Sequence, residues 1–160
     1  MPPRFRDTPG RADVAAIRRI VESTGHFRPD ETTIAIELIE DRLAKGLAAS
    51  GYHFVFADSG ADTVGYACFG PIPCSLASWD LYWIAVMDAW RGHGLGRALL
   101  RHAEDTARAA GGRAVYVETS SRPQYDATRA FYQACGYALE HVFADFYAPG
   151  DGKAVYVKRL

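Results

Sequence analysis

The segment LYWIAVMDAWRGHGLGRALL, residues 81–100, decides how the rest of the chain is interpreted. The run 79–87 is aromatic and β-branched, which predicts a buried strand. Glycines then alternate at positions 92, 94 and 96, and apolar residues at helical spacing continue from Leu95, which predicts a helix to about Ala110. A strand, a glycine turn and a helix in this order are typical of a mixed α/β sheet with a parallel crossover.

The turn Arg91-Gly92-His93-Gly94-Leu95-Gly96-Arg97 has the chemistry of a phosphate site. The first amides of a helix have no helical partner and carry partial positive charge, so they favour an anion. Glycines let the backbone approach that anion closely, and arginines add charge-assisted hydrogen bonds. A plain tight turn is the alternative, but three glycines between two arginines favour the anion site.

Several phosphate motifs compete for this turn. A Walker loop needs Gly-Lys-Ser/Thr, whereas Arg97 and Ala98 follow the last glycine here. A dinucleotide fingerprint needs its third glycine where Arg97 or Leu99 stands, yet Glu118 ends the next predicted strand, where a ribose-binding acid would lie. A small dinucleotide-binding protein is therefore an alternative. It is disfavoured because several elements precede the turn.

The remaining periodicities extend the prediction outward from this unit. The predicted order is β-α-α-β-β-β-α-β-α-β-β, with Leu95, Ala98, Leu99, His102, Ala103 and Thr106 on the buried face of the helix after the glycine turn. The final strands, 138–147 and 154–158, are predicted to be joined by a turn over residues 149–152. The other predicted helices cover about 13–25, 30–47 and 126–135, and the other predicted strands cover 5–8, 52–57, 63–69 and 114–118.

The composition sets the class of protein. Of 160 residues, 49% are apolar and 23% charged, as expected for one globular domain over residues 1–160. The net charge of −1 removes the electrostatic reason to expect a nucleic-acid partner. Three cysteines without paired spacing argue against a disulfide framework or a metal site and favour a cytoplasmic protein. No signal peptide or membrane-spanning run is expected.

Three features together resemble the GNAT N-acetyltransferases. Arg91, Gly94 and Gly96 match the family's Gln/Arg-x-x-Gly-x-Gly/Ala turn, and the strand over 81–86 resembles its cofactor-binding strand. The segment 125–137 resembles the pattern Asn-x-x-Ala-x-x-Phe/Leu-Tyr-x-x-x-Gly-Phe/Tyr, with Tyr125 in place of Asn. The resemblance implies a mixed sheet flanked by helices with a C-terminal β-hairpin. It also implies acetyl transfer from acetyl-CoA to a primary amine of a small molecule, peptide or protein. A homodimer is compatible with it.

The resemblance also implies roles for individual residues. Tyr132 is implied as the general acid for the departing CoA thiolate, because a neutral phenol suits that task. Glu118 is implied as the general base, with Asp80 as a weaker alternative. The implied cofactor contacts are the main chain of Ile84, Ala85 and Val86, the turn residues Arg91, Gly92, His93, Gly94, Leu95, Gly96 and Arg97, and Tyr125. The implied acceptor lining is Phe27, Trp83, Phe146 and Tyr147. A CoA-binding module without turnover is the alternative from another class.

Overall fold

The computed structural model describes residues 1–160 and confirms the predicted order of elements. Seven strands form a mixed sheet in the order β1-β2-β3-β4-β5-β7-β6, which confirms the predicted fold class. The elements are β1 (Arg4–Arg6), α1 (Ala12–Ser23), α2 (Pro29–Ser50), β2 (His53–Ser59), β3 (Asp62–Pro71), β4 (Ser78–Val86), α3 (Leu95–Ala109), β5 (Ala114–Ser120), α4 (Asp126–Ala134), β6 (Ala138–Ala148) and β7 (Asp151–Arg159).

Some boundaries differ from the prediction for local reasons. The predicted turn over 149–152 is shorter, because β7 already begins at Asp151 and pairs there with Ala148 of β6. Two 3-10 turns, η1 (Asp88–Trp90) and η2 (Pro123–Tyr125), precede α3 and α4 and were not predicted. The second helix continues past Leu47 to Ser50 and has a kink at Gly46. The φ of Gly46 is 81°, a value that residues with a side chain rarely adopt.

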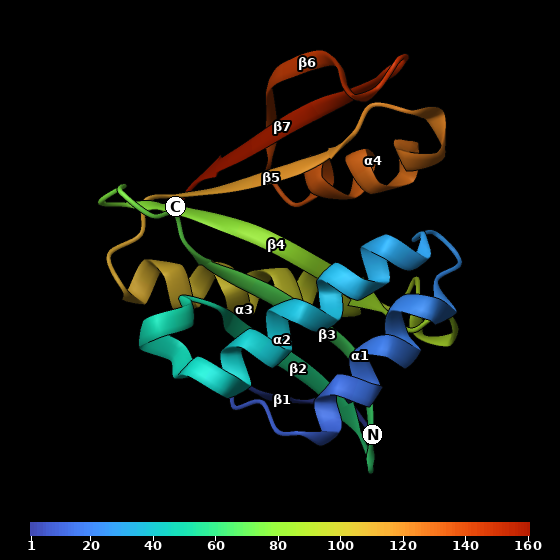
Figure 1. Ribbon diagram of the computed structural model, residues 1–160, viewed down its shortest axis with the longest axis vertical. Coiled ribbons are helices and arrows are strands. Elements are labelled where there is room, and N and C mark those ends of the chain that lie inside the picture. The colour runs from blue at the N-terminus through green and yellow to red at the C-terminus, as the bar shows by residue number, and fades with distance from the viewer. The chain divides into compact units, whose positions relative to one another are not determined.

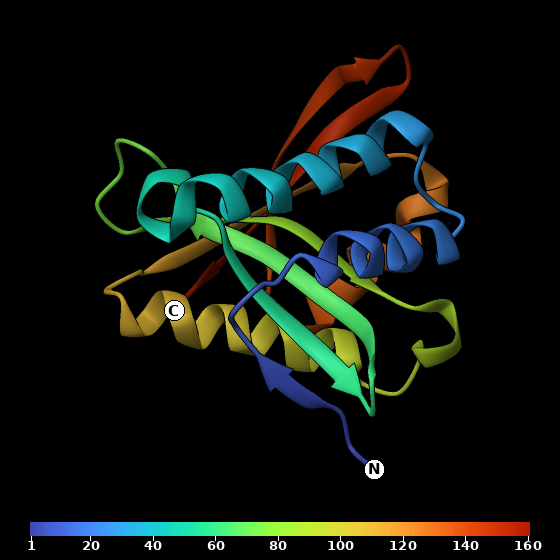
Figure 2. The same cartoon turned by 60° about the horizontal axis from the view of Figure 1, so that its bottom comes forward.

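The chain forms two compact units, and the first comprises residues 1–70 and 82–106. Its core lies between the pair α1 and α2 and one face of β2 and β3 (Figure 1). The largest fully buried side chains on this face are Tyr66, Phe54 and Phe56, and Ile17, Ile20 and Ile39 of the two helices pack on them. Helix α3 covers the opposite face of the same strands (Figure 2).

Gly65 of β3 allows the start of α3 to approach the sheet. A Cβ at this position would lie 3.1 Å from Leu99 Cδ1, 3.3 Å from the Ala85 carbonyl oxygen and 3.4 Å from Leu95 Cδ2. Contacts this short force neighbouring atoms to move. The absent side chain therefore sets how closely the glycine turn and α3 lie against β3 and β4.

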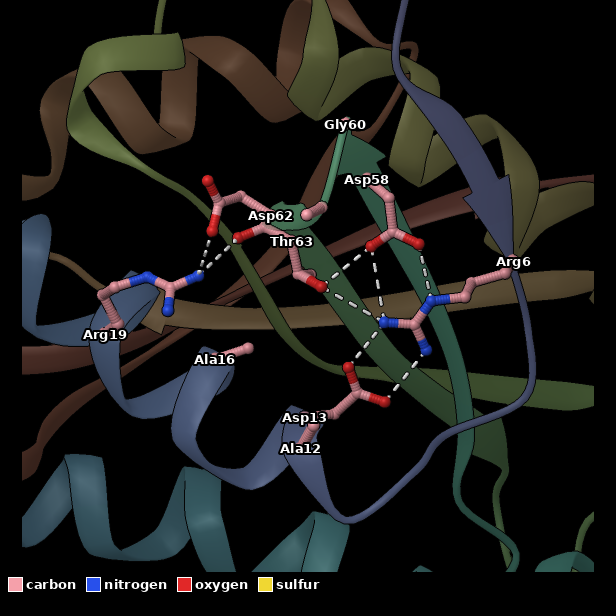
Figure 3. Close-up of a pocket in the computed structure, with 10 residues that line it drawn as sticks. Arg6, Ala12, Asp13, Ala16, Arg19, Asp58, Gly60, Asp62 and Thr63 are labelled. Carbon is pink, nitrogen blue, oxygen red and sulfur yellow. Dashed lines mark hydrogen bonds and ion pairs between the residues drawn. The ribbon is translucent and has the colours of Figure 1, made fainter.

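A charged cluster joins β1, α1, β2 and β3 on the side of the first unit drawn in Figure 3. The Arg6 guanidinium donates to Asp13 at 2.5 and 2.9 Å, to Asp58 at 2.6 Å and to Thr63 Oγ1 at 3.2 Å. The bonds to Asp13 outweigh burial and raise the pKa of Arg6. Because every charge in the cluster is paired, we interpret it as a structural clasp.

The second unit comprises residues 71–81 and 107–160. Residues 78–81 of β4 pair in parallel with residues 114–117 of β5, and β7 pairs antiparallel with both β5 and β6. Helix α4 packs on this unit through Tyr132, whose ring centroid lies 5.8 Å from that of Tyr137 and 6.3 Å from that of Tyr156. Strand β6 is exposed along its whole length.

Candidate active site

The glycine turn lies between β4 and α3, as predicted, with the unpredicted turn η1 before it, and the space beside its backbone is open. Gly92 and Gly94 have φ values of 77° and 79°, which other residues adopt only under strain. A Cβ at either position would meet nothing within 4 Å, so the space beside this backbone is open. The first helical hydrogen bond runs from Ala98 N–H to the Gly94 carbonyl, 3.1 Å long. The amides of residues 94–97 precede that bond and are the N-terminal donors of α3, and those of Gly92 and His93 lie in the turn before them.

Two arginines flank this turn. Arg91 Nη1 lies 3.4 Å from Asp88 Oδ1, and Arg91 Nη2 lies 3.3 Å from His26 Nε2. Arg97 is exposed in the first turn of α3, and His93 is exposed between the glycines. The turn thus combines main-chain donors with two cationic side chains, which fits the diphosphate of CoA.

The strand before the turn contributes main-chain groups. Ile84 and Val86 of β4 are half-buried, and Ala85 between them is buried. The next residue, Met87, donates its N–H to the Val64 carbonyl at 2.8 Å and so ties the end of β4 to β3. This tie and the close approach at Gly65 hold the strand end and the glycine turn in one rigid arrangement.

An aromatic pair lies beside this strand in the first unit. Phe27, just before α2, packs on Trp83 of β4 with ring centroids 4.9 Å apart. Trp83 Nε1 is buried without a hydrogen-bond partner. A buried indole N–H without an acceptor is unusual, since leaving it unpaired costs about 1–3 kcal/mol. The structure therefore brings together two of the four residues predicted to line the site of the amine acceptor. One of them, Trp83, has an unpaired N–H group.

Two carboxylates and a lysine form a cluster in the second unit. Asp80 of β4 is registered with Tyr116 of β5, so Glu118 is its diagonal neighbour on the same face. Burial raises the pKa of Asp80 to about 6, the Glu118 charge adds to the rise, and Lys153 opposes it. Lys153 Nζ lies 3.6 Å from Glu118 Oε1; the lysine side chain is 16% exposed and the glutamate side chain 52%. Asp80 is therefore the more buried carboxylate of the two, and its raised pKa makes it a stronger base than an ordinary aspartate.

Tyr132 is buried in α4 with 5% of its surface exposed. Burial raises the pKa of its phenol, and Cys135 adds to the rise, so Tyr132 holds its proton at neutral pH. Tyr125 lies at the end of η2, directly before α4. Arg129 of the same helix donates to the Ser120 carbonyl at 2.5 Å and to the Arg122 carbonyl at 3.0 Å, which fixes the path from β5 into α4.

The other two predicted acceptor residues lie on the exposed strand of the hairpin. Phe146 and Tyr147 are 54% and 49% exposed, and their ring centroids are 5.1 Å apart. Lys153 Nζ lies 4.0 Å from the Phe146 ring centroid, within cation–π range. Asp145, with φ of 56°, accepts a hydrogen bond from Gly150 N–H at 2.7 Å and bends the hairpin here. The cluster of Asp80, Glu118 and Lys153 is thus continuous with an aromatic surface.

The hollow drawn in Figure 3 has a different character. It has a volume of about 280 Å³ and lies around the Arg6 clasp. None of the predicted site residues lines it, and its guanidinium and carboxylates are hydrogen-bonded to one another. The hollow therefore adds no reactive group to the candidate site.

Two residues that sequence reasoning missed now belong to the site. His26 contacts Arg91, and Lys153 contacts Glu118 and Phe146. Neither lies in a motif, because each contact joins segments distant in sequence. The alternation of side chains along the last strand could have shown which face of the sheet Lys153 occupies. It could not have shown which residues of the neighbouring strands Lys153 contacts.

Three further observations concern metal ligands, the length and hydrophobicity of the helices, and the cysteines. No group of three or more His, Cys, Asp or Glu side chains is arranged to hold a metal ion. None of the helices combines the length and the apolar character that a membrane crossing requires. None of Cys68, Cys74 and Cys135 forms a disulfide.

The fold and the glycine turn define the class of acyl-CoA-dependent transferases, and comparison with known proteins identifies the family. The model of the acetyltransferase (GNAT) family matches residues 15–137. The chain is 32% identical over 114 residues to the N-alpha-acetyltransferase RimI of Mycobacterium tuberculosis, covering 71% of this chain and 69% of the relative. The chain belongs to the GNAT acetyltransferase family, as the resemblance predicted.

Solved structures agree with this assignment. A protein assigned to the GNAT family from Desulfovibrio desulfuricans is 44% identical, has a TM-score of 0.96 and covers 98% of both chains. A Salmonella typhimurium structure containing acetyl-CoA shares the fold at 21% identity, with a TM-score of 0.76 over 100% of this chain and 95% of that one. Acetyl transfer from acetyl-CoA to an amine, predicted from the sequence, is therefore supported at the level of the family.

Proposed function

We propose that residues 1–160 act as one domain that acetylates a primary amine of a peptide, protein or small molecule by direct attack on acetyl-CoA. The open glycine turn at the start of α3 carries this proposal, because its amides and arginines match a diphosphate. Acetyl-CoA supplies the activated acetyl group as a thioester. The chain's own residues bind it, orient it and move two protons.

The turn and the neighbouring strand hold the cofactor in this proposal. The amides of residues 92–97, with Arg91 and Arg97, bind the diphosphate. The main chain of Ile84, Ala85 and Val86 binds the pantetheine amides, and the N–H near Val86 polarises the thioester carbonyl. Tyr125 replaces the asparagine of the family pattern and packs beside the cofactor.

The carboxylate pair removes the proton from the acceptor. We assign the direct role to Asp80, since its raised pKa of about 6 makes it a stronger base than an ordinary aspartate. Glu118 is the second member of the pair; its charge raises the pKa of Asp80, and its own carboxylate is bound to Lys153. Tyr132 O–H then gives its proton to the departing thiolate as the C–S bond breaks, and the proton that the attacking nitrogen loses as the amide forms restores the phenol.

The basicity of Asp80 favours acceptors with weakly basic amines. Moving a proton from an α-ammonium, with a pKa near 7.8, to a group with a pKa of about 6 costs about 2 kcal/mol. The same transfer from a lysine ammonium, with a pKa near 10.4, costs about 6 kcal/mol. We therefore propose an α-amine, such as a peptide N-terminus, as the acceptor, with the Phe27–Trp83 pair and the Phe146–Tyr147 pair as its two candidate contact surfaces.

Calorimetry and turnover test the assignment. We expect CoA to bind and NAD not to bind in isothermal titration, and NAD binding without a response to CoA would reject the acetyltransferase in favour of a dinucleotide-binding protein. In a screen of free α-amine peptides against lysine-only peptides that carry a blocked N-terminus, we expect free-thiol release with the former. CoA binding without turnover on any amine would instead support the non-catalytic module.

Three variants separate the catalytic roles. Tyr132→Phe and Asp80→Asn are each expected to lower kcat by about 100-fold or more while leaving the Kd for CoA unchanged, because general acid–base groups contribute about 10²–10⁴-fold. Glu118→Gln is expected to retain kcat within a few fold. A larger loss in Glu118→Gln than in Asp80→Asn would assign the base to Glu118 instead.

A further inference from the structure

The end of α1 and its connection to α2 contact the end of β4 and the segment that follows it at three points. Asp88 N–H donates to Ser23 Oγ at 3.3 Å, and Arg91 Nη2 donates to His26 Nε2 at 3.3 Å. Phe27 packs on Trp83 at 4.9 Å between ring centroids. These contacts lie between residues 23–27 and 83–91 of the first unit. The α1–α2 connection is therefore held against the segment that leads from β4 to the glycine turn.

The position of His26 within this connection is well defined. Thr24 Oγ1 donates to the Val21 carbonyl at 2.8 Å and accepts from His26 N–H at 3.2 Å, which closes the end of α1. Gly25, with φ of 67°, provides the left-handed step that turns the chain. On the other side, Phe27 is fixed against Trp83. His26 thus projects from a short segment that is held at both ends.

The hydrogen bond between His26 and Arg91 has one possible direction. A guanidinium has donors and no acceptor, so Arg91 donates and His26 Nε2 accepts. Asp88 Oδ1 lies 3.4 Å from the other terminal nitrogen, Nη1, of the same guanidinium. A guanidinium has five N–H donors, so donors remain for an anion after these two contacts.

We propose that His26 is a positioning residue of the cofactor site. Together with Asp88, it holds the Arg91 side chain at the start of the glycine turn, ready to bind the diphosphate of CoA. Without His26, the arginine would lose one of its two side-chain partners and sample more rotamers before binding. This inference rests on the proposed assignment of the turn to the diphosphate.

Titration of CoA into single variants and the double variant tests this role. We expect His26→Ala to raise the Kd for CoA about two- to fivefold, the scale of one exposed charge-assisted hydrogen bond. His26→Gln should restore most of the affinity, because its amide oxygen also accepts from Arg91. In His26→Ala/Arg91→Ala, the His26 change should add nothing to the loss from Arg91→Ala. His102→Ala, an exposed histidine on α3, is the matched control and should leave the Kd unchanged.

An acetyl donor without the diphosphate distinguishes a positioning role of His26 from a general disturbance of the active site. Acetylpantetheine lacks the diphosphate, so His26→Ala should leave its KM and kcat unchanged while raising the KM for acetyl-CoA. If Arg91→Ala weakens CoA binding but His26→Ala does not, or if both variants add independently, the role of His26 is refuted. If Arg91→Ala and Gly94→Ala both leave CoA binding intact, the assignment of the turn itself has failed.

Discussion

The carboxylate cluster of the second unit predicts two opposite shifts in the titration of Asp80. The Glu118 charge raises the pKa of Asp80, and the Lys153 charge lowers it. Glu118→Gln should therefore lower the pKa of Asp80 from about 6, and Lys153→Met should raise it. Lys153→Arg retains the charge and is the matched control.

The register of the strands sets the size of these shifts. Glu118 is the diagonal neighbour of Asp80, so the two side chains lie roughly 7–8 Å apart. At that separation, two unit charges interact by about 0.5–1.1 kcal/mol for an effective dielectric of roughly 80–40. Glu118→Gln should thus lower the pKa of Asp80 by about 0.4–0.8 unit. The shift in Lys153→Met should be smaller, because Lys153 has the weaker influence on Asp80.

Carbon-13 NMR of the aspartate carboxyl groups measures these shifts without any acceptor. The Asp80 resonance is assigned by its absence in Asp80→Asn, and its midpoint is followed from about pH 3 to pH 9. An Asp80 midpoint near 4, or shifts of the same sign in Glu118→Gln and Lys153→Met, would refute the coupled cluster. An unshifted midpoint in Lys153→Arg would show that charge, rather than packing on Phe146, is the cause.

Three further predictions concern stability and reactivity. Asp13→Ala should lower the free energy of unfolding by about 2–4 kcal/mol in urea denaturation, because it leaves Arg6 without its strongest partner; a loss below 0.5 kcal/mol would contradict the structural clasp. Gly65→Ala should cost about 1–3 kcal/mol and also weaken CoA binding, since its Cβ pushes against Leu99 and the Ala85 carbonyl; an unchanged melting temperature would show that α3 moves freely. Burial raises the pKa of the Cys68 thiol, so a disulfide reagent and mass spectrometry should find Cys74 modified rapidly and Cys68 unmodified until unfolding.

The periodic parts of the fold could be predicted because short-range chemistry determines them. The strand before the turn, the glycine alternation and the start of α3 at Leu95 all follow from local propensity and spacing. The buried face of α3 was predicted less well. His102 and Thr106 are exposed, whereas Leu100 and Glu104 are buried. The rotation of a helix on a sheet depends on the surface it meets, and that surface is not encoded in the helix itself.

The candidate site shows the same division. The residues of the glycine turn and Tyr132 lie in contiguous motifs, so their resemblance to the GNAT motifs indicated acetyl-CoA and an acetyltransferase. Lys153 was missed because its contacts with Glu118 and Phe146 arise from the register of β5, β7 and β6. His26 was missed because only the path of the α1–α2 connection brings it to Arg91. The burial that raises the pKa of Asp80 was likewise not visible in the sequence.

The amino-acid sequence by itself determined the class of this protein: the order of its elements, its GNAT membership and the glycine turn before α3. These depend on interactions between residues close in the chain, whose chemistry can be read from spacing. Only the tertiary structure decided that burial raises the pKa of Asp80, which side chains contact Arg91 and which ring meets Lys153. Burial, charge coupling and cross-strand register are properties of segments brought together from distant positions, and they exist only after the chain has folded.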